Sequence, residues 1–114
     1  MILVDTGPLV AVLDADDHRH LECTNLLEQA SVPLVVPMTV IVEVCQIAER
    51  VRGPQAEAAF LRSAAAGEFT VEPVSSADLT RAAELVETYA DLGLGLVDAS
   101  VIAVAERRDI TTIA

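Results

Sequence analysis

Ile2-Leu3-Val4-Asp5-Thr6-Gly7-Pro8 opens the chain and decides its fold. Three aliphatic residues followed by an acid and a Gly-Pro pair predict a buried strand that ends at Asp5 and turns into a helix. In an open α/β sheet, ligands and metals bind at the carboxyl ends of the strands. The opening stretch therefore predicts a buried strand with a carboxylate at the functional edge of its sheet.

Short aliphatic runs alternate with helical stretches along the rest of the chain. Strands are expected at residues 1–4, 34–36, 69–72 and 110–113, and helices at 9–13, from Asp16-Asp17 to about 30, 38–52, 55–66, from a Ser75–Asp78 capping box to about 90, and 98–108, with a loop at 91–95. Such alternation predicts an α/β protein, a three-layer α/β/α sandwich with a central parallel sheet, in a single domain spanning residues 1–114.

The composition fits this architecture. Hydrophobic residues make up 53% of the chain and aromatic residues only 3%, so the core must be aliphatic, as is typical of a sheet covered on both faces. The mean hydropathy of +0.48 predicts leftover apolar surface for a partner. No apolar run approaches the roughly 20 residues of a membrane span, and no signal peptide is recognisable. Cys23 and Cys45 are expected to be buried free thiols, in a cytoplasmic protein.

The charge balance narrows the possible functions. The net charge is −11, with seven basic residues, all of them arginine. This argues against tight non-specific binding to nucleic acid, which depends on phosphate neutralisation. A nuclease whose metal ions supply the local positive charge remains compatible with it. Arg50, Arg52, Arg107 and Arg108 are expected at helix ends far from the functional edge.

Two further acids, Glu43 and Asp98, lie in apolar surroundings like Asp5. Each of the three has a structural alternative: Asp5 as a turn former, Glu43 as a side chain that reaches outward to water, and Asp98 as a helix cap. Embedded carboxylates are nevertheless costly unless they are paired, protonated or bound to a cation. Together they predict a site for Mg²⁺ or Mn²⁺, hard cations that can activate water and clamp a phosphodiester. His18 and His20 are two residues apart and are expected at the surface.

Three motifs carry a resemblance to a known family. Residues 1–9, Val35-Val36-Pro37 followed by Glu43, and residues 94–99 resemble the motifs of PIN domains, specifically the VapC-type toxins of bacterial toxin–antitoxin pairs. The resemblance implies a Mg²⁺-dependent (or Mn²⁺-dependent) endoribonuclease, the toxin of a type II system, often homodimeric and held inactive by its antitoxin. It implies Asp5, Glu43 and Asp98 as catalytic acids, Asp5 and Asp98 as metal ligands, and Thr6 in a supporting role.

The resemblance weakens at the end of the chain. The family usually continues past a segment like residues 110–114 into a region with a fourth acid, so we expect this chain to lack the family's C-terminal end. That leaves open the activity of the 114-residue form and an alternative function, a catalytically inactive PIN-fold protein that acts by protein–protein binding.

Three other α/β families fit the sequence less well. A phosphoacceptor receiver domain relies on a lysine, which is absent here, and a haloacid-dehalogenase-type phosphatase needs a second Asp where Gly7 stands. A dinucleotide-binding turn needs more glycines than Gly93-Leu94-Gly95 supplies.

Overall fold

A four-stranded parallel sheet forms the centre of the computed structural model, which describes all residues from Met1 to Ala114. The strands are β1 (Ile2–Leu3), β2 (Leu34–Pro37), β3 (Thr70–Glu72) and β4 (Thr112–Ile113), in the order β3-β2-β1-β4. In the register of the sheet, Leu3 pairs with Val35 on one side and with Ile113 on the other. The predicted parallel sheet is confirmed, and its first strand lies inside the sheet, where both neighbours bury it.

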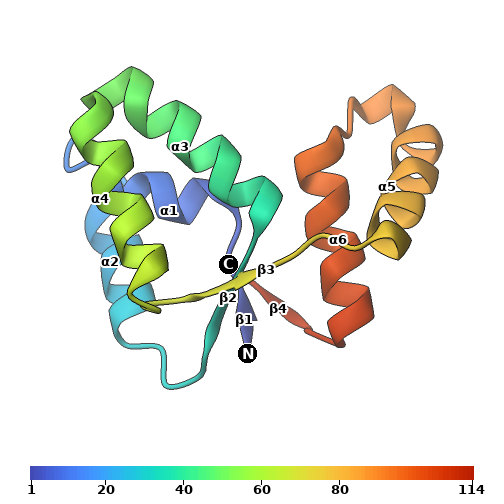
Figure 1. Cartoon of the computed structure of the whole chain (residues 1–114), viewed down its shortest axis with the longest axis horizontal. Helices are drawn as coiled ribbons and strands as arrows, with labels where there is room; N and C mark the ends of the chain where they lie inside the picture. Colours follow the sequence, from blue (N-terminus) through green and yellow to red (C-terminus); the bar gives the residue numbers. More distant parts are fainter.

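Helices cover both faces of the sheet. They are α1 (Thr6–Leu13), α2 (His20–Glu28), α3 (Met38–Arg52), α4 (Pro54–Ala65), α5 (Ser76–Thr88) and α6 (Leu96–Arg108), with a short 3₁₀ turn, η1 (Ala90–Leu92), before α6. Figure 1 shows α1 to α4 on one side of the sheet and α5 and α6 on the other. The three-layer α/β/α sandwich is therefore confirmed. None of the helices has the length and hydrophobicity that a membrane span requires.

The core is aliphatic, as the composition predicted. Its most deeply buried side chains come from the two central strands and the helices packed on them: Leu3, Val4, Val35, Val36, Val40, Val44 and Val104. The two phenylalanines, Phe60 and Phe69, stack with ring centroids 5.5 Å apart at the edge of this cluster. Cys23 and Cys45 are buried free thiols, also as predicted.

Three helix starts differ from the sequence-based expectation. The first helix begins at Thr6 and not at Leu9, because Asp5 caps it and the Gly7-Pro8 pair fits its first turn. The Asp14 and Asp17 side chains accept hydrogen bonds from the amides two residues ahead, so they form turns and α2 begins only at His20. The last helix begins at Leu96 with Gly95 as its cap, which makes Asp98 part of its first turn and not the cap. The expected loop at 91–95 contains part of the short η1 turn.

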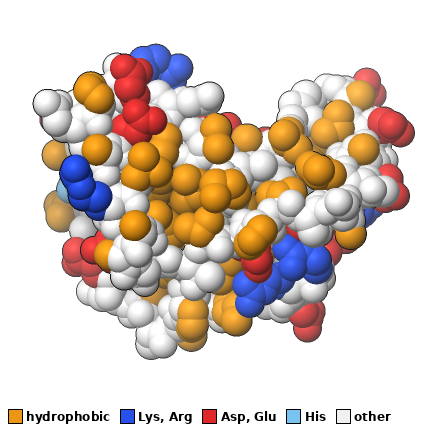
Figure 2. Space-filling model, viewed as in Figure 1, with side chains coloured by type: hydrophobic (Ala, Val, Ile, Leu, Met, Phe, Trp, Pro, Cys, Tyr) orange, Lys and Arg blue, Asp and Glu red, His pale blue; other side chains and the backbone are white.

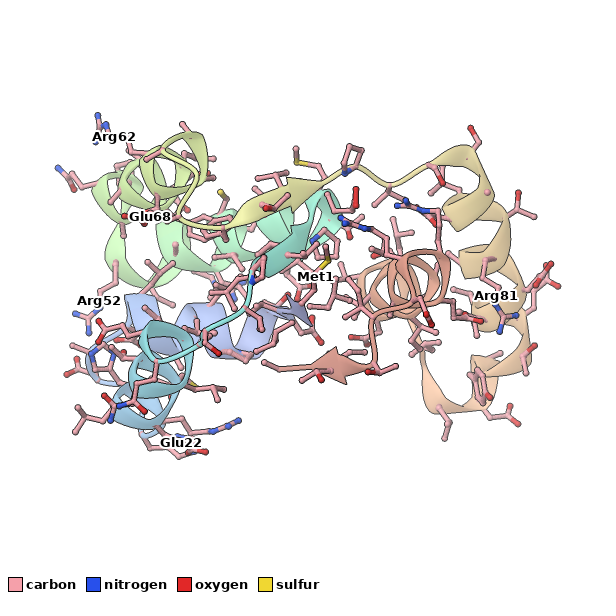
Figure 3. All side chains as sticks on the ribbon, turned by 90° about the horizontal axis from the view of Figure 1, so that it is seen from below. Met1, Glu22, Arg52, Arg62, Glu68 and Arg81 are labelled. Carbon is pink, nitrogen blue, oxygen red and sulfur yellow. The ribbon has the colours of Figure 1, made fainter.

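Most arginines hold elements of the fold together. Arg52 bridges from the end of α3 to Asp14 and Asp16, and Arg108 pairs with Glu72 of β3. Four further acids are bound by other arginines: Arg19 pairs with Glu22, Arg81 with Glu84 and Glu106, and Arg107 with Asp78. Figure 3 shows Arg52 and Arg62 at one end of the molecule and Arg81 at the other. Arg50 and Arg62 alone make no ion pair.

Asp78 is the most buried charged residue, with 2% of its surface exposed. The predicted capping box is confirmed, because the Asp78 amide donates to the Ser75 hydroxyl and the Asp78 carboxylate accepts from the Ser75 amide. The Arg107 guanidinium also donates to this carboxylate, at 2.9 Å, and lowers the pKa of Asp78. One carboxylate thus fixes the start of α5 to the end of α6.

Replacing Asp78 with Asn should lower the free energy of unfolding by about 2 kcal/mol at pH 7, because a charge-assisted hydrogen bond is lost in a buried setting. A carboxyl whose pKa is lowered by folding contributes stability above its unfolded pKa of about 3.9, and that contribution is lost as the pH falls through the folded pKa. The difference between Asp78→Asn and the wild type, measured by urea unfolding, should therefore shrink in acid. Asp91→Asn, at an exposed residue without an ion pair, is the control. An equal difference in the free energy of unfolding at pH 7 and in acid would contradict this account.

Candidate metal centre

Asp5 lies at the point where β1 leaves the sheet. Its amide still donates to the Ala114 carbonyl at 3.1 Å, so the backbone is held in the sheet up to this residue. One carboxylate oxygen, Oδ1, accepts a hydrogen bond of 2.7 Å from the Thr6 amide at the start of α1. The turn-forming role considered from the sequence is thus real, but it uses only one of the two oxygens.

Glu43 reaches the same edge from a different element. The helix α3 begins directly after β2, so its first turns lie beside the carboxyl end of that strand. The Glu43 side chain is half-buried and has no hydrogen-bond or ion-pair partner in the protein. A half-buried carboxylate without a donor is destabilising unless a cation or water reaches it.

Asp98 stands in the first turn of α6, after the glycine-containing segment at 93–95. The pKa of its carboxyl is raised, first because the surrounding protein partly excludes water and then because the Asp5 and Glu43 carboxylates repel its negative charge. Such repulsion weakens with distance, so the three acids occupy one neighbourhood. Asp98 is nevertheless exposed, not embedded as the sequence suggested, and the convergence of Asp5, Glu43 and Asp98 on one ion stays a prediction.

These acids do not form a finished ligand shell. In this conformation no three Asp, Glu, His or Cys side chains approach closely enough to hold one ion together. Their roles as catalytic acids and metal ligands stay predictions. His18 is exposed, as expected, whereas His20 is half-buried and its Nδ1 lies 2.7 Å from the Ala11 carbonyl oxygen.

The surroundings of the acids nevertheless fit a hydrated hard cation. No arginine pairs with any of the three acids, whereas five arginines bind acids elsewhere. The Thr6 hydroxyl, next to Asp5, is buried and has no hydrogen-bond partner in the protein. Buried polar atoms normally find a partner in protein or ordered water. Uncompensated carboxylates and an unpartnered hydroxyl are what a metal ion with its bound water would complete.

An apolar groove runs beside this edge. It has a volume of about 340 Å³ and is lined by Met38, Thr39, Val42, Pro73 and Val74, from α3 and from the segment after β3. Figure 2 shows hydrophobic side chains gathered over the face between the α1–α4 side and the α5–α6 side of the molecule. The outline has a notch between these two sides. The leftover apolar surface expected from the hydropathy is therefore present.

Sequence reasoning did not single out Thr39 or Ser100, although both belong to this region. Their hydroxyl oxygens lie 2.5 Å apart, joining α3 to α6. The only trace of them in the sequence was their spacing from the acids: Thr39 precedes Glu43 by four residues, and Ser100 follows Asp98 by two. Neither residue type is charged, so a search for carboxylates could not find them.

Comparison with known proteins agrees with this arrangement. Residues 2–114 match the PIN domain family. The chain belongs to the PIN-domain family. Ribonuclease VapC26 from Mycobacterium tuberculosis (strain ATCC 25618 / H37Rv) is 30% identical over 112 residues, which are 98% of this PIN domain and 83% of that protein.

Solved structures share the fold of this PIN domain. The M. tuberculosis toxin VapC20, described as cleaving the sarcin–ricin loop, matches with a TM-score of 0.93 at 24% identity and covers 99% of this chain and 87% of its own. A toxin–antitoxin complex from Klebsiella pneumoniae matches with a TM-score of 0.71 at 22% identity, covering 100% and 85%. The resemblance to VapC-type PIN domains, first suggested by the three acidic motifs, is confirmed.

The raised pKa of Asp98 leads to a stability prediction for the metal-free PIN domain. When folding raises the pKa of an acid, ionisation favours the unfolded chain, so stability falls as the pH rises from the unfolded value of about 3.9 through the folded one. Asp98→Asn should therefore be more stable than the wild type at pH 7, even though a carboxylate in the first turn of a helix is itself favourable. Urea unfolding in EDTA measures the difference.

Asp91→Asn again serves as the control, because that residue is exposed and unpaired. A lower stability of Asp98→Asn at neutral pH would show that the neighbouring carboxylates do not destabilise the charged form.

Proposed function

We propose that this PIN domain is a Mg²⁺-dependent (or Mn²⁺-dependent) endoribonuclease and the toxin of a type II toxin–antitoxin pair. The observation that carries the proposal is the placement of three acids without ion-pair partners by β1, α3 and α6 toward the carboxyl edge of the sheet. The raised pKa of Asp98 supports it, first through partial exclusion of water and then through the Asp5 and Glu43 carboxylates. The names of the relatives support it, since VapC26 is a ribonuclease and VapC20 cleaves the sarcin–ricin loop.

Each acid has a role that its position supports. Asp5 and Asp98 would hold the ion, because both follow backbone that is fixed, by the sheet at Asp5 and by the first turn of α6 at Asp98. Glu43, which has no partner in the protein, would complete the coordination or orient the attacking water. The unpartnered Thr6 hydroxyl would hydrogen-bond to a water on the ion. When bound, such an ion lowers the pKa of its water and neutralises charge on the phosphodiester.

The metal is also needed to bring RNA to an acidic protein. The net charge is −11, and five of the seven arginines are engaged by acids of the fold. A bound cation is often the largest local charge in a site and can reverse the local sign of the potential. The phosphate backbone would otherwise meet three carboxylates at this edge.

Replacing Asp5 with Asn should abolish RNA cleavage while keeping the fold. The amide still offers an oxygen to cap α1, but it removes one negative charge from the ion's ligands. We expect cleavage to fall by more than about 100-fold, because even outer-shell partners of a metal contribute up to that factor. Cleavage of RNA is measured with Mg²⁺ or Mn²⁺ and in EDTA, with Asp91→Asn as the control. Cleavage that persists in EDTA or in Asp5→Asn would exclude this mechanism.

A second apolar cleft, on the side of the sheet covered by α1 to α4, offers a surface for the antitoxin. It has a volume of about 230 Å³ and is framed by α1, α2 and α4 and by strand β2. Nine of its twelve lining residues are hydrophobic, including Leu13, Leu27 and Phe60, and the acids Glu28 and Glu68 also line it. We propose that an apolar segment of the antitoxin with a basic residue beside it docks here. The Klebsiella pneumoniae neighbour, solved as a toxin–antitoxin complex, supports a partner of this kind.

Filling this cleft should prevent antitoxin binding without affecting catalysis. Ser63 of α4 lines the cleft, whereas Ala59 lies on the same helix at an exposed position outside it. Ser63→Phe should therefore lose co-purification with the antitoxin encoded beside its gene, and Ala59→Phe should retain it. RNA cleavage by both variants should match the wild type. Retention of the antitoxin by Ser63→Phe would place the partner on another surface.

A second candidate function is protein binding without catalysis. It is favoured by the absence of a finished ligand shell in this conformation and by the presence of the apolar cleft. A 114-residue chain that binds the antitoxin but cleaves no RNA with either metal would support this alternative. The homodimer implied by the resemblance, for which the groove beside α3 offers apolar surface, stays a prediction that sedimentation of the purified chain tests.

A further inference from the structure

A chain of two hydroxyl groups crosses from α3 to α6 beside the acids. The Ser100 hydroxyl donates to the Val97 carbonyl at 2.7 Å, and its oxygen lies 2.5 Å from that of Thr39. A serine hydroxyl has a single proton. Since that proton is directed to Val97, Thr39 must donate to Ser100, and the order of the chain is Thr39 to Ser100 to Val97.

Both ends of this chain are coupled to predicted metal-site acids. Thr39 lies one helical turn before Glu43 on the same face of α3, because residues four apart are neighbours on a helix. At the other end, the Val97 carbonyl belongs to the peptide unit whose nitrogen is that of Asp98. The hydroxyl chain therefore fixes the peptide that leads into Asp98 relative to the helix that carries Glu43.

The positions of α3 and α6 indicate what this hydroxyl link does. The helices α3 and α6 lie on opposite sides of the sheet and diverge beyond the edge where they meet (Figure 1). The helix α3 carries Glu43 and α6 carries Asp98, and neither carboxylate has an ion-pair partner in the protein. Ser100 is fully buried, so its bond to Thr39 is shielded from competing water. The link opposes separation of the two helices at the level of the acids.

We propose that Thr39 and Ser100 are positioning residues that set the distance between Glu43 and Asp98 for a divalent cation. The inference rests on the proposed metal-dependent function, but the hydroxyl chain is a property of the metal-free fold. In this role neither residue would need to contact the ion or the RNA. Their effect is to reduce the rearrangement that the two acids need before they can share a cation.

The test compares isosteric and conservative variants. Thr39→Val keeps the shape of the side chain but removes the donor, Ser100→Ala removes the acceptor, and Thr39→Ser restores the donor. Thr80→Val is the matched control, because Thr80 on α5 also donates a hydroxyl hydrogen bond, to the Ser76 carbonyl, at an exposed position. The affinity of each full chain for Mn²⁺ is measured by calorimetry, and amide hydrogen exchange at residues 99–101 is followed without metal.

Thr39→Val and Ser100→Ala should bind Mn²⁺ about 10-fold more weakly, within the range for outer-shell partners of a metal. Thr39→Ser and Thr80→Val should keep the wild-type affinity. Without metal, the two disrupting variants should exchange their amides at 99–101 faster than the control does. Thr39→Ser keeps the hydroxyl donor but lacks the methyl group. Wild-type affinity in this variant would therefore show that the hydrogen bond, and not the packing of the side chain, sets the affinity for Mn²⁺.

The possible failures are distinguishable. A wild-type chain that binds no Mn²⁺ would contradict the proposed function, whereas a Thr39→Val variant that binds as tightly as the wild type would contradict only the positioning role. Unchanged amide exchange in Thr39→Val would show that the hydroxyl chain does not hold the start of α6, regardless of the affinity for Mn²⁺.

Discussion

The delivery of acids to one edge of a parallel sheet, without basic partners, is the constraint around which this protein is arranged. Parallel strands all deliver their carboxyl ends to the same edge, so acids that follow different strands meet there. Asp5 arrives directly from β1, Glu43 from the helix after β2, and Asp98 from the first turn of α6. Nothing cationic in the chain pairs with them, although acids elsewhere are bound by five arginines. The fold thus keeps a concentrated negative charge unneutralised at one place.

This separation of charge explains how an acidic chain can belong to a family of nucleases. Four of the seven arginines stabilise contacts between elements distant in sequence, as Arg52 does with Asp14 and Arg108 with Glu72. They are therefore not available to form an extended basic surface. In the proposed function, attraction for phosphate comes from an ion at the acidic edge. The partial exclusion of water and the neighbouring carboxylates that raise the pKa of Asp98 also make that edge favourable for a cation.

Much of the fold could be predicted from local sequence signals. The aliphatic runs gave the four strands, Gly53 marked the end of α3, and the Ser75–Asp78 pair marked the start of α5. The start of α2 could not be found in this way, because Asp17 is a good helix cap by type but its side chain instead closes a turn onto the Arg19 amide. Cap and turn use the same side-chain chemistry, and only the backbone path distinguishes them.

The three candidate acids could also be picked out from the sequence, but the hydroxyl contact between the helices that carry two of them could not. Asp5, Glu43 and Asp98 stand out because a charge within an apolar run is unusual. Thr39 and Ser100 are common in helices and gain meaning only from a contact across 61 positions of sequence. Contacts of that range depend on how α3 and α6 cross at the sheet edge, which no local pattern encodes.

The helix α6 connects these features because it is anchored at both ends. Its first turn carries Asp98 and is tied to α3 through Ser100, while Arg107 and Arg108 at its last turn bind Asp78 and Glu72. Repulsion acting on Asp98 therefore cannot be relieved by sliding or tilting the helix without breaking a buried contact at one end or the other. In the proposed function, a cation bound at this edge would offset the charge of the acids, and any ligand that binds only the folded state also stabilises the fold.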